Sequence, residues 1–210
     1  AGACFSSIDT GGRYAYGQQP AITQWNLARL AEALLDLIDP DPQRAIDDAS
    51  AVLAEFEEEY RAAFTRVFAR KLGIEAEPDV ALAQFVANTL ESLEREHVDF
   101  TLFFRALAEG QSIDGEFAAG SAWRAELEEL RSRGGTSLER AEALMRETNP
   151  IYIPRNHHVE AALRDIERGE REKFERLLTA IRDPWTRRDG FEDLEAPPAH
   201  ARFFTSFCGT

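Results

Sequence analysis

Residues 42–73 read PQRAIDDASAVLAEFEEEYRAAFTRVFARKLG, and they carry the strongest structural signal in the chain. Apolar side chains recur there at steps of three and four residues: Ile46, Ala49, Leu53, Phe56, Tyr60, Ala63 and Val67. Such steps place the side chains on one face of an α-helix. Asp41 before Pro42 is a typical helix start, and Gly73 is a typical end. We therefore predict one long amphipathic helix between them.

The same periodicity predicts that most of the remaining chain is helical. The expected helices lie at about 20–38, 78–98, 100–107, 123–133, 136–147, 158–168 and 171–182. Thr136 followed by Glu139 predicts a capping box at the start of one of them. No stretch shows the alternation typical of a strand. We predict an all-α fold in three parts, namely an irregular segment at 1–20, a helical part at 21–183 and an irregular tail at 184–210 that carries Cys208.

Composition and charge exclude several classes of protein. Among the 210 residues 44% are hydrophobic, too many for a mainly disordered chain. The 24 basic and 38 acidic residues give a net charge of −14, which repels phosphate backbones and anionic lipids, so we expect no nucleic-acid or membrane partner. Ala1–Cys4 lack the features of a signal peptide. The basic residues are almost all Arg, which favours a bacterial source, and we expect a cytoplasmic location.

Residue spacing offers no complete metal site or nucleophilic site. Glu94 and His97 have the i, i+3 spacing of a di-metal ligand pair, but the second pair and the extra carboxylates that such a site requires are missing. His157 and Glu160 are also incomplete as a metal site. We interpret them as ordinary helix residues, with a carboxylate metal bundle as an alternative. No Gly-x-Ser-x-Gly elbow is present, and no spacing requires Cys208 to act with a histidine.

Two segments have unusual composition. Thr10–Gly17 (TGGRYAYG) is a glycine-rich turn in which Arg13 is suited to pair with a carboxylate or phosphate, although a loop that packs its two tyrosines on the next helix is the alternative. Asn149–His157 (NPIYIPRNH) is held extended by two prolines. By residue type the second segment is a structural clamp between helices more often than a catalytic loop.

Five segments together resemble the selenoprotein O family (SelO, YdiU), in the family's order and from the first residues to the last. They are Gly12–Tyr16 (GRYAY), Gln19–Pro20, Trp25–Ala31 (WNLARLA), Asn149–Glu160 (NPIYIPRNHHVE) and Cys208–Thr210 (CGT). The resemblance gives structural roles to motif residues in two of these segments: Trp25, Asn26, Arg29, Asn149, Pro150, Pro154, Arg155, Asn156 and His157.

The resemblance implies a protein-kinase-like (pseudokinase) fold. It also implies an enzyme that uses Mg²⁺ or Mn²⁺ to transfer AMP from ATP to Ser, Thr or Tyr hydroxyls of protein substrates. The family's ATP-binding, catalytic and metal-binding residues precede the segment that matches Ala1. The chain therefore resembles the helical part of the C-lobe plus the C-terminal extension. We expect no catalytic or metal-binding residue in it, no cofactor of its own and no activity without the missing N-terminal portion of the parent. Arg13 is expected to contact the activation region.

The resemblance also implies a redox role for both cysteines. In the family a cysteine of the activation region pairs with the terminal cysteine, so Cys4 and Cys208 are the expected disulfide, with a thioredoxin-type protein as reductant. A different class of function stays open: a standalone acidic helical module that binds a protein and catalyses nothing.

Overall fold

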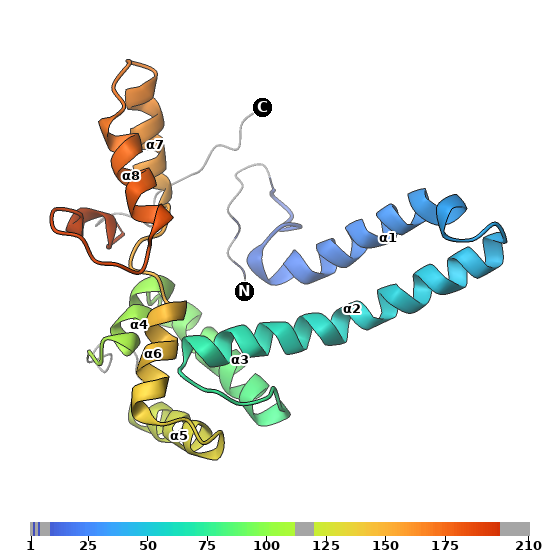
Figure 1. Ribbon diagram of the computed structural model, residues 1–210, viewed down its shortest axis with the longest axis horizontal. Helices are drawn as coiled ribbons and strands as arrows, with labels where there is room; N and C mark the ends of the chain where they lie inside the picture. The colour runs from blue at the N-terminus through green and yellow to red at the C-terminus, as the bar shows by residue number, and fades with distance from the viewer. Residues whose placement is uncertain (1, 3, 5–8, 112–119, 198–210) are drawn as a thin grey trace. The chain divides into compact units, whose positions relative to one another are not determined.

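The computed structural model describes residues 2, 4, 9–111 and 120–197 (Figure 1). Cys208, one half of the expected disulfide, lies outside these residues. The described residues form eight α-helices and two short 3-10 helices, with no strand among them. The all-α prediction is therefore confirmed. None of the helices in these ranges is long and apolar enough to cross a membrane.

The chain divides into two compact units, and the division falls inside one continuous helix, between Thr65 and Arg66. The first unit contains the 3-10 helix η1 (Tyr16–Gln18), α1 (Gln19–Ile38) and the larger part of α2 (Pro42–Lys71). Pro20 lies in the first turn of α1, and Asp39 ends the helix in an extended conformation. Both ends of α1 agree with the sequence pattern.

Several large apolar side chains of α1 are exposed. Ile22 is buried, but Trp25 is 49% exposed and Leu37 is 81% exposed. Among the described residues of this unit only η1 and α2 are available to cover α1, so a two-helix hairpin leaves many apolar side chains of α1 in contact with solvent.

The second unit contains the remaining helices. They are α3 (Val80–Arg95), α4 (Phe100–Ala108), α5 (Gly120–Arg133), α6 (Leu138–Thr148), α7 (Asn156–Ile166), α8 (Glu172–Arg182) and the 3-10 helix η2 (Glu192–Leu194). Figure 1 shows α7 and α8 as an antiparallel hairpin, and α4 packs against α6. Gly169, at a φ of +85°, lies in the turn between α7 and α8.

Side-chain caps fix the starts of three of these helices. The carboxylates of Asp79 and Asp99 accept hydrogen bonds from the amides of Leu82 and Leu102, at the starts of α3 and α4. At α6 the cap is Ser137, whose hydroxyl accepts from the amide of Arg140. The predicted capping residue, Thr136, is thus wrong by one position. Its hydroxyl accepts instead from the amide of Glu75, 61 residues earlier.

The core of the second unit is aromatic. Trp123 of α5 stacks on Phe85 of α3 with 5.5 Å between ring centroids, and meets Phe103 of α4 edge-on at 5.6 Å. The buried indole N–H donates to the hydroxyl of Thr89 at 2.7 Å, and this hydroxyl donates in turn to the carbonyl of Phe85. The polar edge of the indole is therefore satisfied inside an apolar cluster.

The C-terminus of α2 is buried in this unit, where Leu72 and Ile74 are almost fully inaccessible. Gly73 follows the helix at a φ of +69°, and a Cβ at this position would lie 2.8 Å from the carbonyl oxygen of Ala141 in α6. Glycine is required there both for the left-handed backbone and for the close approach of α6.

Candidate functional site

The glycine-rich loop that precedes η1 is held by one carboxylate. The two oxygens of Asp9 accept from the amides of Arg13 and Tyr14, at 2.9 and 2.7 Å. The hydrogen bond from Tyr14 is the main reason why the pKa of Asp9 lies below its usual value. The thiol of Cys4 is 3.4 Å from the same carboxylate. Asp9 thus connects the two residues of this region that the sequence singles out, Cys4 and Arg13.

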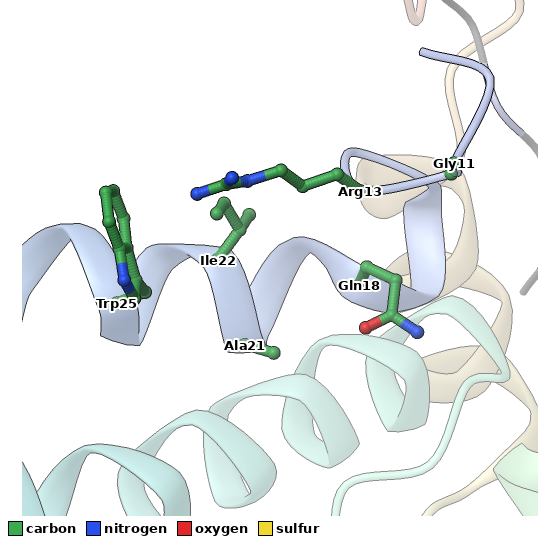
Figure 2. Close-up of a pocket in the computed structure, with 7 residues that line it drawn as sticks. Gly11, Arg13, Gln18, Ala21, Ile22 and Trp25 are labelled. Atoms are coloured by element: carbon green, nitrogen blue, oxygen red, sulfur yellow. The ribbon is translucent and has the colours of Figure 1, made fainter.

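The side chain of Arg13 lies along α1 and ends at the indole of Trp25 (Figure 2). Its guanidinium carbon is 4.9 Å from the centroid of the indole, and that of Arg29 is 5.5 Å away. A guanidinium over an indole face is held by a cation–π interaction. Arg29 is also paired with Glu32 at 2.6 Å, whereas no acidic side chain in the described part of the chain forms an ion pair with Arg13.

Arg13 and Trp25 border a shallow pocket of about 370 Å³ that lies wholly within the first unit. It is lined by Gly11, Gly12, Arg13, Gln18, Ala21, Ile22 and Trp25. The rings of Tyr14 and Tyr16 are each about half exposed, so this loop is not packed tightly onto the helix through them. Asn26, the neighbour of Trp25 in the motif, is exposed on α1.

The second segment, 149–157, lies in the other unit and begins at a buried amide. The Nδ2 of Asn149 donates to the carbonyl of Lys71 at 2.9 Å, and its Oδ1 accepts from the Nζ of Lys71 at 3.2 Å. The carbonyl of Asn149 accepts from the guanidinium of Arg105 in α4. One residue therefore connects the end of α2, the end of α6 and α4.

Further along the segment, Arg155 makes a two-pronged ion pair. Its two terminal nitrogens donate to the carboxylate of Asp99 at 3.0 and 3.2 Å, and one of them also donates to the carbonyl of Glu195. The side chain of Arg155 is only 9% exposed, and its Nε is buried without a partner in the described residues. Burial opposes the charge of Asp99, but the hydrogen bonds from Arg155 and from the Leu102 amide outweigh it and keep the pKa of Asp99 below its usual value.

Between these two anchors the segment inserts its apolar side chains. The amides of Ile151 and Tyr152 both donate to the carbonyl of Pro184, and the hydroxyl of Tyr152 accepts from the amide of Arg188. Ile151 and Tyr152 pack in a cluster with Ala180, Leu194 and the partly buried Phe191. These contacts, with those of Asn149 and Arg155, are what the clamp interpretation predicts. Pro150 is partly buried, whereas Pro154 and Asn156 are exposed.

The two histidines after the clamp lie close together at the start of α7. Their ring centroids are 3.9 Å apart, and a ring nitrogen of His158 is 3.1 Å from the carbonyl of Asp193. Burial, with smaller contributions from His158 and Arg155, lowers the pKa of His157. In the described ranges no three His, Cys, Asp or Glu side chains gather closely enough to hold a metal ion. This part of the chain therefore offers no ligand set made of protein side chains alone, whereas Mg²⁺ commonly binds through one or two carboxylates together with substrate phosphates.

Sequence reasoning missed Lys71 and Arg131. Lys71 is half-buried, lies over the rings of Phe100 and Phe104 at 5.5 and 5.4 Å, and has a pKa lowered by burial. The guanidinium of Arg131 donates twice to the carbonyl of Leu72, at 3.0 and 2.7 Å. One signal was present for Lys71, because only positions 71 and 173 carry lysine in this arginine-rich chain. The signal for Arg131 is its position four residues after Leu127, which places it on the buried face of α5 with Trp123 and Leu127.

A family model described as protein adenylyltransferase SelO matches residues 4–182. A relative described as protein nucleotidyltransferase YdiU, from Rhodococcus jostii, is 44% identical over 222 residues, which cover 99% of this chain and 42% of the relative. A YdiU protein from Agrobacterium fabrum is 40% identical over 218 residues, which cover 98% of this chain and 44% of the relative. The chain thus spans less than half the length of the curated relatives that it matches.

The ion pair between Asp99 and Arg155 gives a prediction for pH dependence. Because the folded pKa of Asp99 is below its unfolded value, the pair stabilises the fold above about pH 4, and this stabilisation is lost as the pH falls through the folded pKa. Asp99→Asn retains a capping oxygen but leaves Arg155 buried without its charge partner. We therefore expect the free energy of unfolding to fall by about 2 kcal/mol at pH 7. The difference from the wild-type chain should shrink below about pH 4.

Urea unfolding of both proteins between pH 7 and pH 3 measures this difference. Asp79→Asn is the matched control, because Asp79 also caps a helix and pairs with an arginine, Arg133, but at a half-exposed position. We expect the free energy of unfolding of that variant to fall by less than about 1 kcal/mol. A difference between wild type and Asp99→Asn that stays constant down to pH 3 would contradict the role given to this ion pair.

Proposed function

Since the chain belongs to the family of the protein adenylyltransferase SelO, we propose that it is the C-terminal portion of an enzyme that transfers AMP from ATP to protein hydroxyls. The match over residues 4–182 carries this proposal, and relatives named protein nucleotidyltransferase support the reaction class. The family resemblance of the motifs adds Ser, Thr and Tyr as acceptors and a pseudokinase-type fold, and the arginine-rich composition adds a bacterial, cytoplasmic location.

In the proposed reaction the acceptor hydroxyl attacks the α-phosphorus of ATP. A new O–P bond forms, the bond between the α- and β-phosphates breaks, pyrophosphate leaves and the hydroxyl proton passes to solvent or to a base. Positioning and the charge of a divalent ion drive such reactions. Because the family's ATP-binding and metal-binding residues precede the segment that matches Ala1, we assign ATP and Mg²⁺ or Mn²⁺ to the missing N-terminal portion of the parent.

For this chain we propose two roles in the parent. The clamp of Asn149 and Arg155 gives the helical unit a fixed shape on which the rest of the enzyme rests. The loop of Asp9 and Arg13 presents the surface that meets the protein substrate. Both roles rest on binding and orientation, and neither gives this chain a part in bond making.

A comparison of the parent with the 210-residue chain tests the activity. We expect the full-length protein to incorporate label from [α-³²P]ATP into protein when Mg²⁺ or Mn²⁺ is present, and the 210-residue chain to incorporate none. Label from [γ-³²P]ATP serves as the control. It leaves with pyrophosphate in AMP transfer, whereas phosphorylation would transfer it to the protein. Transfer of the γ-label, or no transfer of either label by the parent, would overturn the proposal.

We further propose that Cys4 and Cys208 form a regulatory disulfide. The two thiols lose two protons and two electrons to a disulfide oxidant such as oxidised glutathione, which leaves as two reduced molecules. A thioredoxin-type dithiol reverses the step by exchange. The thiol of Cys4 lies beside Asp9 in the loop that orders Arg13, so this bond would tether the tail to that loop.

Non-reducing peptide mapping of the chain after treatment with oxidised glutathione checks the pairing. We expect a peptide pair that joins residues 4 and 208 and that disappears on treatment with thioredoxin. Cys4→Ser is the control and should abolish the pair. Oxidised wild-type protein in which both thiols alkylate freely would rule the disulfide out.

A further inference from the structure

The pocket beside Trp25 contains a cationic group, the guanidinium of Arg13, which is near enough to Asp9 to lower the pKa of that carboxyl but forms no ion pair with it. The only carboxylate held within the loop, that of Asp9, uses both oxygens on the amides of Arg13 and Tyr14. The guanidinium of Arg13 lies instead on the indole face and forms no ion pair with any residue in the described ranges. Its N–H groups therefore remain available to a group from outside the loop.

Stacking restricts what this guanidinium can bind. An arginine that lies on an indole keeps its planar fork in one orientation, so less freedom is lost when it binds a ligand. The fork matches two oxygens of a carboxylate or phosphate and forms two parallel hydrogen bonds to them. A neutral ligand lacks the negative charge that strengthens these two hydrogen bonds.

The surroundings favour a side chain over a free ion. Ala21 and Ile22 give the pocket apolar surface, against which the methylene groups of an acidic side chain can lie, and a volume of about 370 Å³ accommodates one side chain with part of its backbone. Arg29 also lies over the indole of Trp25 and adds a second positive charge, although its guanidinium is already paired with the carboxylate of Glu32. In a chain of net charge −14, the two arginines balance the nearby carboxylates of Asp9 and Glu32.

We propose that the Arg13–Trp25 pocket binds an oxyanion-bearing side chain of a protein partner, either a glutamate or aspartate carboxylate or a phosphorylated residue. This inference rests on the proposed function, because the partner is taken to be the protein that receives AMP. That protein would then carry an acidic or phosphorylated residue near its acceptor hydroxyl. Arg13 is then a substrate-positioning residue with no share in the transfer step.

Binding of peptides to the 210-residue chain tests the pocket without ATP. Three peptides of one sequence carry Glu, phosphoserine or Gln at the central position, and inorganic phosphate is a fourth probe. The indole of Trp25 is the fluorescent reporter in a Trp185→Phe background, since Trp185 is also exposed whereas Trp123 is buried. We expect the Glu or the phosphoserine peptide to bind at least about tenfold more tightly than the Gln peptide.

Arginine variants show whether the binding depends on the fork. Arg13→Gln should weaken binding of the charged peptide about tenfold or more, and Arg13→Lys should recover only part of it. Arg44→Gln is the matched control, an exposed arginine of the same unit on α2, and should bind like wild type. Circular dichroism should be the same for all three variants, because these side chains lie on the surface.

Each outcome decides the inference. Preference for the Glu or for the phosphoserine peptide, lost in Arg13→Gln, supports it and identifies the source of the oxyanion. Equal binding of the Gln peptide, wild-type binding by Arg13→Gln, binding of inorganic phosphate alone or no binding at all overturns it. Since no AMP transfer is measured, failure of the proposed enzymatic function would leave this result unchanged, and failure here would leave AMP transfer standing.

Discussion

The buried C-terminus of α2 imposes the requirement around which the second unit is arranged. The last carbonyls of a helix have no partner within it, and an unpaired carbonyl away from water costs free energy. Here the carbonyl of Lys71 accepts from Asn149, and that of Leu72 accepts twice from Arg131. The donors come from the end of α6 and from α5, so satisfying one helix end fixes the positions of two others. Gly73 permits the close approach of α6 that this arrangement needs.

The segment that begins at Asn149 extends this arrangement to the remaining helices. Its prolines hold it extended, and Ile151 and Tyr152 pack in one cluster with Ala180 and Leu194. Arg155 joins the cap of α4 to residue 195. The 149–157 segment thus connects several helices, which is the role that its residue types suggest. The Arg13 pocket belongs to the other unit and is built differently, from an exposed loop and one helix face. We assign support of the fold to the first arrangement and contact with a partner to the second.

Much of this architecture is predictable from sequence, because helical period, prolines and capping residues are local signals. The bounds of α1 and α2 follow from Pro20, Asp39, Asp41 and Gly73. Contacts between distant residues are not local, so the roles of Lys71, Arg131 and Thr136 were missed or misassigned. The boundary inside α2 carries no proline or glycine to mark it. The stacking of Arg13 on Trp25 depends on the turn that Asp9 orders, which no periodicity indicates.

Hydrogen exchange in Asn149→Ala tests most directly whether the end of α2 organises the second unit. The account predicts faster exchange of amides at 69–74, together with those of α4 and the 149–155 segment, and a loss of stability of about 2 kcal/mol, because the carbonyl of Lys71 loses its donor. Asn156→Ala, an exposed change in the same motif, should leave exchange and stability unchanged. Exchange in Asn149→Ala that matches wild type at 69–74 would contradict the claim.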